Sequence, residues 1–151
     1  TFNDIGIATT RAGLTVPAAK GIMNRLATSK PDVVVAELGD GILGEYGVQD
    51  ILRDPELTGV GVAYVMAAPD PVGCWGAVTL MRDLFNLPVT VITGPATDNE
   101  VGRDYVKAEL QLPAHNAMRD AESLVKIVLA AVEARQQASS RVSSPQLAAV
   151  G

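Results

Sequence analysis

Two patterns alternate along most of this chain: short runs rich in valine and isoleucine, and longer stretches whose apolar residues recur at helical spacing. This alternation is typical of β-α-β units, in which helices connect parallel strands. The chain has 151 residues, enough for one domain with a sizeable core. We therefore predict an α/β fold with three layers, in which helices cover both faces of a mainly parallel sheet.

Strands are predicted at residues 32–38, 60–67 and 88–93, and residues 5–9 are a candidate fourth strand. The run at 32–38 is continuously β-branched over Val33, Val34 and Val35, as strands buried on both faces of a parallel sheet are. Three strands are few for an α/β domain of this length. The sheet is therefore expected to be incomplete on its N-terminal side.

Helices are predicted at residues 16–28, 48–53, 70–85, 97–110 and 119–135. The helix after Asp70 has the strongest start, because an Asp N-cap is followed by a proline whose missing N–H would have no partner. Thr97 and Glu100 have the spacing of a capping box, which would turn Val101, Tyr105 and Ala108 inward.

The domain prediction is a single α/β domain over residues 1–137, followed by a disordered or loosely docked tail over 138–151. That tail is rich in serine and alanine, which bury too little apolar surface to offset the entropy of ordering them. The predicted helix 70–85 is apolar on most sides, so Trp75 is expected in the core. The broad apolar surface of this helix is also compatible with a homo-oligomer.

Composition and charge exclude several functions. Lysine and arginine total 12 against 17 acidic residues, a net charge of −5, and the basic residues are scattered, so we expect no nucleic-acid partner. No apolar run reaches the roughly 18 to 20 residues that span a bilayer, and no signal peptide is recognisable, so we expect a cytoplasmic protein. The single cysteine and single histidine exclude a disulfide framework and a metal site built from several of either.

Ligands of open parallel sheets bind beyond the carboxyl ends of the strands. Four segments are expected there: residues 9–11, 37–44, 69–70 and 93–99. Side chains in or near these segments are candidates for contacts with a phosphate or a substrate, with a capping or solvated position as the alternative in each case; they are Thr9, Thr10, Arg11, Arg103 and His115.

The second segment contains the pattern G-x-G-x-x-G, at Gly39, Gly41 and Gly44. In dinucleotide-binding domains this pattern lets a helix N-terminus approach a pyrophosphate. A Rossmann-type site is therefore one interpretation, although Asp40 within the loop would repel phosphate and Gly47 weakens the helix that must begin there. A glycine-rich turn without a ligand is another interpretation.

A third interpretation rests on residues 14–19 (LTVPAA), the predicted helix that follows, and residues 32–43 (DVVVAELGDGIL). This arrangement resembles the dethiobiotin synthetase and cobyrinate amidase branch of P-loop NTPases, in which such a helix leads into a strand ending in a glutamate and a glycine-rich loop. The resemblance implies that Glu37 binds Mg²⁺ and acts in catalysis with Asp40, and that the loop from Gly39 to Gly44 lines the substrate and γ-phosphate. It also implies that residues from Thr93 to Asn99 contact the nucleotide base.

The function implied by the resemblance is a Mg²⁺- and ATP- or GTP-dependent enzyme that activates a small carboxylate or carbamate substrate. The phosphate-binding motif G-x-x-x-x-G-K-[ST] does not occur in the sequence, and phosphoryl transfer depends strongly on it. Either the chain is the C-terminal part of a longer protein that supplies this motif, or it is a non-catalytic module that binds a nucleotide or another small molecule. Both alternatives, and the Rossmann interpretation, are compatible with the sequence.

Overall fold

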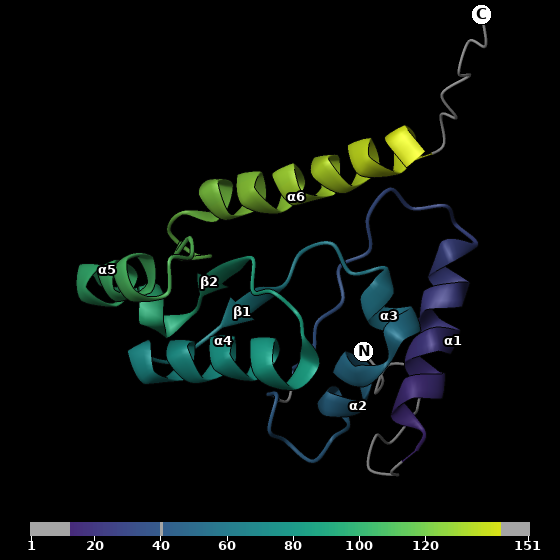
Figure 1. Cartoon of the computed structure of the whole chain (residues 1–151), viewed down its shortest axis with the longest axis horizontal. Coiled ribbons are helices and arrows are strands. Elements are labelled where there is room, and N and C mark those ends of the chain that lie inside the picture. Colours follow the sequence, from purple (N-terminus) through teal and green to yellow (C-terminus); the bar gives the residue numbers. More distant parts are fainter. Residues whose placement is uncertain (1–12, 40, 143–151) are drawn as a thin grey trace, which may run out of the picture. The chain divides into compact units, whose positions relative to one another are not determined.

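The computed structural model describes residues 13–39 and 41–142. Side chains are described for the same residues up to residue 140. These residues form helices and short parallel strands (Figure 1). The chain divides into two compact units, with the boundary between Gly61 and Val62. The candidate strand 5–9 and the candidate site residues Thr9, Thr10, Arg11 and Asp40 lie outside the described residues.

The first unit is helical in its described part, with α1 (Thr15–Ala27), α2 (Val48–Arg53) and α3 (Pro55–Gly59). The predictions of helices at 16–28 and 48–53 are confirmed to within one residue at each end. Gly47, which precedes α2, has a φ of 82°, and a Cβ there would lie 2.8 Å from the Cβ of Thr15. Only glycine permits this close approach between the starts of α1 and α2.

Helix α3 was not predicted, although the signal for it is present in the sequence. Asp54 ends α2 and also caps α3, because its Oδ1 accepts hydrogen bonds from the backbone N–H groups of Glu56 (3.0 Å) and Leu57 (3.1 Å). Pro55 occupies the first helical position. Asp54 and Pro55 thus repeat the aspartate–proline start that predicts the helix after Asp70.

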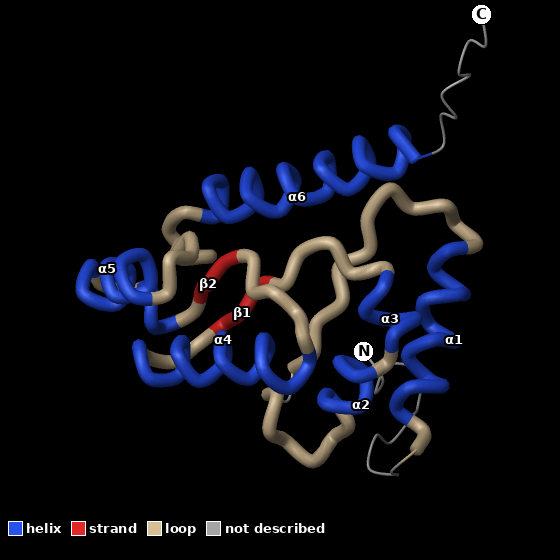
Figure 2. Tube along the Cα trace, viewed as in Figure 1, coloured by secondary structure: helices blue, strands red, loops and turns tan. Residues whose placement is uncertain are grey.

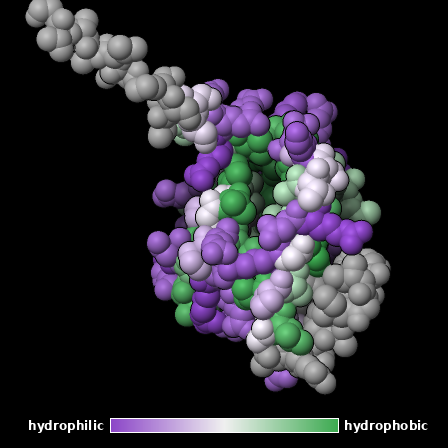
Figure 3. Space-filling view, turned by 90° about the vertical axis from the view of Figure 1, so that its right-hand side faces the viewer, coloured by the Kyte–Doolittle hydropathy of each residue, from purple (hydrophilic) through white to green (hydrophobic). Residues whose placement is uncertain are grey.

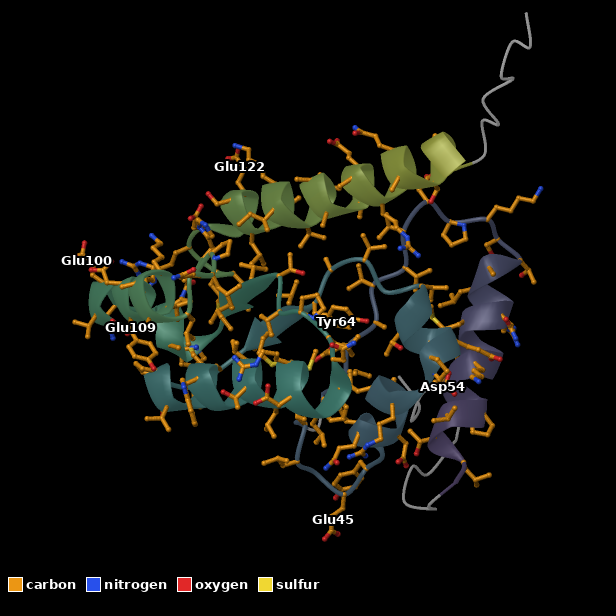
Figure 4. The ribbon with its side chains drawn as sticks, in the orientation of Figure 1. Glu45, Asp54, Tyr64, Glu100, Glu109 and Glu122 are labelled. Carbon is orange, nitrogen blue, oxygen red and sulfur yellow. The ribbon has the colours of Figure 1, made fainter. Side chains whose placement is uncertain are left out.

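An ion-pair cluster connects α1 with α3. The Lys20 ammonium lies 2.8 Å from the Asp54 carboxylate and 2.7 Å from that of Glu56, and Figure 4 shows Asp54 between the two helices. The hydrogen bond from Lys20 lowers the pKa of Asp54, and the hydrogen bond to Asp54 raises the pKa of Lys20. Asp54 therefore acts both as a helix cap and as an ionic link.

The strand predicted at residues 32–38 is wrong. The segment is irregular, and Figure 2 draws it as a loop. Within the described chain no strand pairs with it; Val35 is 89% exposed and Val33 is 46% exposed. Figure 3 shows one face of the molecule, on which hydrophobic residues (green) reach the surface among hydrophilic ones (purple). β-Branched residues favour a strand only where a partner strand and a packed face are available.

The second unit contains a parallel strand pair, β1 (Val65–Ala67) and β2 (Val91–Thr93), in the register Val65↔Val91 and Ala67↔Thr93. Both strands are shorter than the predicted segments 60–67 and 88–93. On the other edge of β2, the N–H of Ile92 donates to Pro113 O (3.0 Å) and its C=O accepts from the N–H of His115 (3.1 Å). Ala114 thereby forms a parallel bridge with Ile92.

Helices connect these extended segments in two successive β-α-β units. Helix α4 (Pro71–Phe85) joins β1 to β2, while the 3-10 turn η2 (Pro95–Thr97) and helix α5 (Glu100–Glu109) lead from β2 to Ala114. Helix α6 (Ala121–Val142) follows, and in Figure 1 the strands lie between α4 and α6. The sequence-based expectation of a mixed α/β chain with a parallel sheet is thus met in this unit.

The predicted start and length of α4 are confirmed, since Asp70 Oδ1 accepts a hydrogen bond from Gly73 N (2.7 Å) and the helix ends at Phe85. Its buried face consists of Cys74, Met81 and Phe85. Burial, with a smaller contribution from the Asp70 charge, raises the pKa of the Cys74 thiol. The prediction that Trp75 lies in the core is wrong, because Trp75 is 55% exposed beside that single packed face.

The predicted start of α5 is also wrong. Asn99 is the N-cap, accepting from Gly102 N (2.9 Å), whereas the Thr97 hydroxyl donates to Gly94 O (2.7 Å) within η2. The shifted start turns Gly102 and the fully buried Val106 inward and leaves Val101 77% exposed; Ala108 is exposed as well, so the predicted inward face is corrected in both places. A Cβ at Gly102 would overlap the carbonyl oxygen of Ala96, which brings α5 directly onto η2.

Helix α6 is longer than predicted. It continues to Val142, so residues 138–142 are helical rather than part of a loose tail; residues 143–151 lie outside the described residues. Of the helices that the structure describes, none is both long enough and apolar enough to cross a membrane.

Candidate functional site

Two loops of the second unit leave the sheet from the same edge. Residues 94–99 follow β2, and residues 115–120 follow Ala114, which pairs in parallel with Ile92 of β2. Both loops therefore begin at the carboxyl ends of neighbouring extended segments. This is the position at which open α/β sheets bind their ligands.

A pocket of about 390 Å³ lies between these loops. Five polar residues line it: Asp98, Arg103, Asn116, Arg119 and Asp120. Two are cationic and two are anionic, so the lining has no net formal charge. Two other carboxylates, Glu100 and Glu122 in the first turns of α5 and α6, do not line the pocket, and in Figure 4 they point outward.

Asn116 connects the two loops. Its residue is 8% exposed, its Nδ2 donates to Asp98 Oδ1 (2.7 Å), and its Oδ1 accepts from the N–H groups of Met118 (3.0 Å) and Arg119 (2.9 Å). A buried amide that uses both its donor and its acceptor holds its neighbours in one arrangement. Asn116 therefore fixes the position of Asp98 relative to the backbone that carries Arg119.

The two arginines are fixed to one turn of backbone. Arg103 Nη1 donates to the carbonyl oxygen of Thr97 (2.7 Å), and Arg119 Nη1 donates to that of Asp98 (2.8 Å). Thr97 and Asp98 are consecutive and both arginines line the pocket, so two guanidinium groups are anchored on adjacent peptide units at its edge. Two cations that line one pocket repel each other, and an anion bound between or beside them would relieve the repulsion.

The acidic side of the pocket is held separately. His115 Nδ1 lies 2.7 Å from Asp120 Oδ2. Hydrogen bonds from the Ser123 side chain and then from His115 hold the pKa of Asp120 below its ordinary value, so this carboxylate stays ionised. The Asp120 carboxylate is therefore already engaged by His115 and by Ser123 at the start of α6.

Two of the predicted site residues lie close to this pocket in the chain but have structural roles. Thr93 is buried at the end of β2, and its hydroxyl oxygen accepts from Ala117 N (3.1 Å), which connects the same two loops. Asn99 caps α5. The predicted segment 93–99 does contribute Asp98 to the pocket lining.

The predicted residues Glu37, Gly39, Gly41 and Gly44 belong to the first unit. Glu37 and Gly39 are exposed, and Gly41 is exposed with a φ of 72° at a turn that is closed by a hydrogen bond from Gly44 N to Gly41 O (3.3 Å). No helix begins within this glycine loop; the next, α2, starts at Val48. The helix N-terminus that a Rossmann-type phosphate site requires is therefore absent from residues 39 and 41–44.

The sequence did not point to Arg119 or Asp120. It predicted Asp98 only as a member of the segment 93–99, and Asn116 only through the loop that contains His115. Arg103 and His115 were recognised as candidates, but nothing joined them to one site. The missing signal was the one-residue extended segment at Ala114, which follows a proline and is too short to be recognised as a strand. Once Ala114 is paired with Ile92, the polar run from His115 to Asp120 falls at the ligand-binding edge.

In the part of the chain that is described, no group of three or more His, Cys, Asp or Glu side chains that could hold a metal ion gathers. Glu37 offers one exposed carboxylate. Mg²⁺ commonly takes one or two carboxylates together with substrate phosphates and water, so Glu37 alone does not define a site. In comparisons with protein-family models, curated proteins and solved structures, nothing matches the chain.

Proposed function

We propose that the second unit is a binding module for a small anionic molecule, held at the carboxyl edge of its sheet by Arg103 and Arg119. One observation carries this proposal: the two guanidinium groups are anchored on the consecutive carbonyls of Thr97 and Asp98, within one pocket. Guanidinium groups recognise phosphates and carboxylates through paired hydrogen bonds. The pocket volume of about 390 Å³ lies within the range of roughly 300 to 1,000 Å³ for small-molecule sites.

Calorimetric titration of the whole chain with inorganic phosphate, ATP, GTP and NAD tests the proposal. At least one phosphorylated ligand is expected to bind, and Arg119→Gln or Arg103→Gln should weaken it about tenfold or more, as for the loss of a charge-assisted hydrogen bond. Arg82→Gln is the matched control, because Arg82 is exposed on α4 and pairs with Asp83 outside the pocket. The proposal fails if none of the four ligands binds or if the pocket variants bind as the control does.

A narrower function is that of a Mg²⁺- and ATP- or GTP-dependent enzyme acting on a small carboxylate or carbamate in the cytoplasm. What supports it is the resemblance of residues 14–44 to the dethiobiotin synthetase-like branch, together with the exposure of Glu37 at the end of the matching segment. The described residues do not by themselves complete a metal site, so no catalytic step is assigned. In this case ATP or GTP should bind more tightly with Mg²⁺ than without it, and Glu37→Gln should remove that difference.

A further inference from the structure

We propose that the ligand of this pocket is a phosphate monoester that carries a hydroxyl or amino group close to its phosphate. Arg103 and Arg119 would hold the phosphate, and the free oxygen of Asp98 would accept a hydrogen bond from the neighbouring group. This inference rests on the proposed binding function and adds to it the class of ligand.

The donor groups of the pocket favour a phosphate. Each arginine uses Nη1 to bind a backbone carbonyl, and among the described residues its Nη2 and Nε have no partner. Two guanidinium groups thus retain two donor nitrogens each, all close to one turn of backbone. A carboxylate has two oxygens, whereas a phosphate monoester presents three, so the phosphate can engage both guanidinium groups at once.

The acceptor groups of the pocket differ between its two aspartates. Asp120 is engaged by His115 and Ser123. Asp98 uses Oδ1 to accept from Asn116, and in the described part of the chain its Oδ2 has no partner. Asp98 thus offers one carboxylate oxygen whose direction is fixed by the buried Asn116. A carboxylate oxygen beside a phosphate site is repulsive unless the ligand places a hydrogen-bond donor there.

The size of the pocket agrees with a ligand larger than phosphate alone. A volume of about 390 Å³ holds many more atoms than a single tetrahedral anion. The ligand therefore has room for a carbon portion, on which the hydroxyl or amino group can reach Asp98.

A matched pair of ligands tests the inference: glycerol 3-phosphate, which carries two hydroxyl groups, and n-propyl phosphate, which has the same carbon chain without them. Calorimetry on the whole chain is expected to give at least tenfold tighter binding of glycerol 3-phosphate, because only it supplies a donor to Asp98. Equal binding of the two esters would overturn this inference while leaving the proposed binding function intact. Binding of neither ester, nor of inorganic phosphate, ATP, GTP or NAD, would overturn both.

The variant Asp98→Asn assigns the discrimination to one atom. The substituted amide oxygen can still accept from Asn116, but a neutral NH₂ group replaces the charged Oδ2. A ligand hydroxyl could then only accept, in a weaker neutral hydrogen bond, so glycerol 3-phosphate should lose most of its advantage over n-propyl phosphate. Asp104→Asn is the control, since Asp104 is exposed on α5 and is absent from the pocket lining. Discrimination that survives in Asp98→Asn, or is lost equally in Asp104→Asn, contradicts the role of Asp98. Circular dichroism identifies a variant that fails to fold, and the ligand pair on the unaltered chain still decides the proposal.

Discussion

The two units of this chain contain similar valine-rich runs with opposite outcomes. In the second unit Val91 is fully buried in β2, which pairs with β1 on one side and, through Ile92, with Ala114 on the other. In the first unit Val35 lies in a loop and is 89% exposed. A run of β-branched residues therefore does not make a strand alone; pairing partners and a packed helix do.

The two units also differ in the depth of their cores. In the first unit the buried apolar side chains among the described residues are Val48 and Leu52, both from α2. In the second unit α4, β2, α5 and the segments next to the strands all contribute; the buried apolar residues are Ala68, Cys74, Met81, Phe85, Val89, Val91, Ile92, Ala96, Val106 and Ala114. Perturbations are accordingly expected to cost more in the second unit than in the first.

The largest effect is expected where backbone packs directly against backbone in the second unit. Gly102→Ala should lower the free energy of unfolding by about 3 kcal/mol or more, because the new Cβ would overlap Ala96 O and neither backbone segment can move freely. Urea denaturation of the two alanine variants measures this. Gly76→Ala, in the interior of α4 with no atom within 4 Å of the new Cβ, is the control and should stabilise by up to about 1 kcal/mol. Similar values for both variants would contradict the packing of α5 on η2.

The comparison of the two valine runs is tested next. Val91→Ala should cost about 2 kcal/mol, from the lost burial of two methyl groups and the cavity they leave. Val35→Ala should change stability by less than about 0.5 kcal/mol, because the side chain is already in solvent. Chemical denaturation under identical conditions measures the difference. A substantial loss in Val35→Ala would mean that residues 32–38 are packed after all.

A smaller effect is expected at the cap of α4. Asp70→Ala should cost about 1 kcal/mol, since it removes the acceptor for Gly73 N. Asp70→Asn keeps an oxygen in the same place and should be nearly neutral. Thermal unfolding of the two variants distinguishes loss of the cap from loss of the charge, and equal destabilisation by both would assign the effect to the charge.

The smallest effect is expected from the partly exposed ion pair of Lys20 and Asp54 in the first unit. The pKa of Asp54 is lowered from its ordinary value of 3.8, so its contribution to stability is present above that pH and is lost as the pH falls through the lower folded-state pKa. The pKa of Lys20 is raised from 10.5, so its contribution is present below that pH and is lost as the pH rises through the higher folded-state value. Unfolding measured against pH in both windows should flatten in Lys20→Met but not in Lys107→Met, an exposed lysine on α5.

Local sequence signals predicted the helices better than the strands. Asp70 with Pro71 located the start of α4, because capping and proline geometry act within one turn. Whether residues 32–38 form a strand could not be decided from the local sequence, since the stability of a strand depends on partner residues far away in the sequence. The start of α5 was missed by two residues because Thr97 and Asn99 both have the chemistry of an N-cap, and the packing of Gly102 on Ala96 selects Asn99.

The location of the candidate site was partly predictable, but most of the residues that line it were not. The rule that ligands bind at the carboxyl ends of parallel strands identified the segment 93–99, which supplies Asp98. The loop from His115 to Asp120 joins it through a single residue pair, Ile92 and Ala114, that no sequence periodicity can reveal. The arginines are held at the pocket by side-chain hydrogen bonds to backbone carbonyls, and these bonds depend on the packed structure.

Because Cys74 is buried, its reactivity can report on opening of the second unit. Cys74 is the single cysteine of the sequence, is inaccessible on α4, and has a thiol pKa raised by burial. A thiol reagent can modify it only after α4 separates from its core, so the rate of modification counts opening events of the second unit alone. Such kinetics would distinguish opening of the second unit from opening of the first without any introduced label.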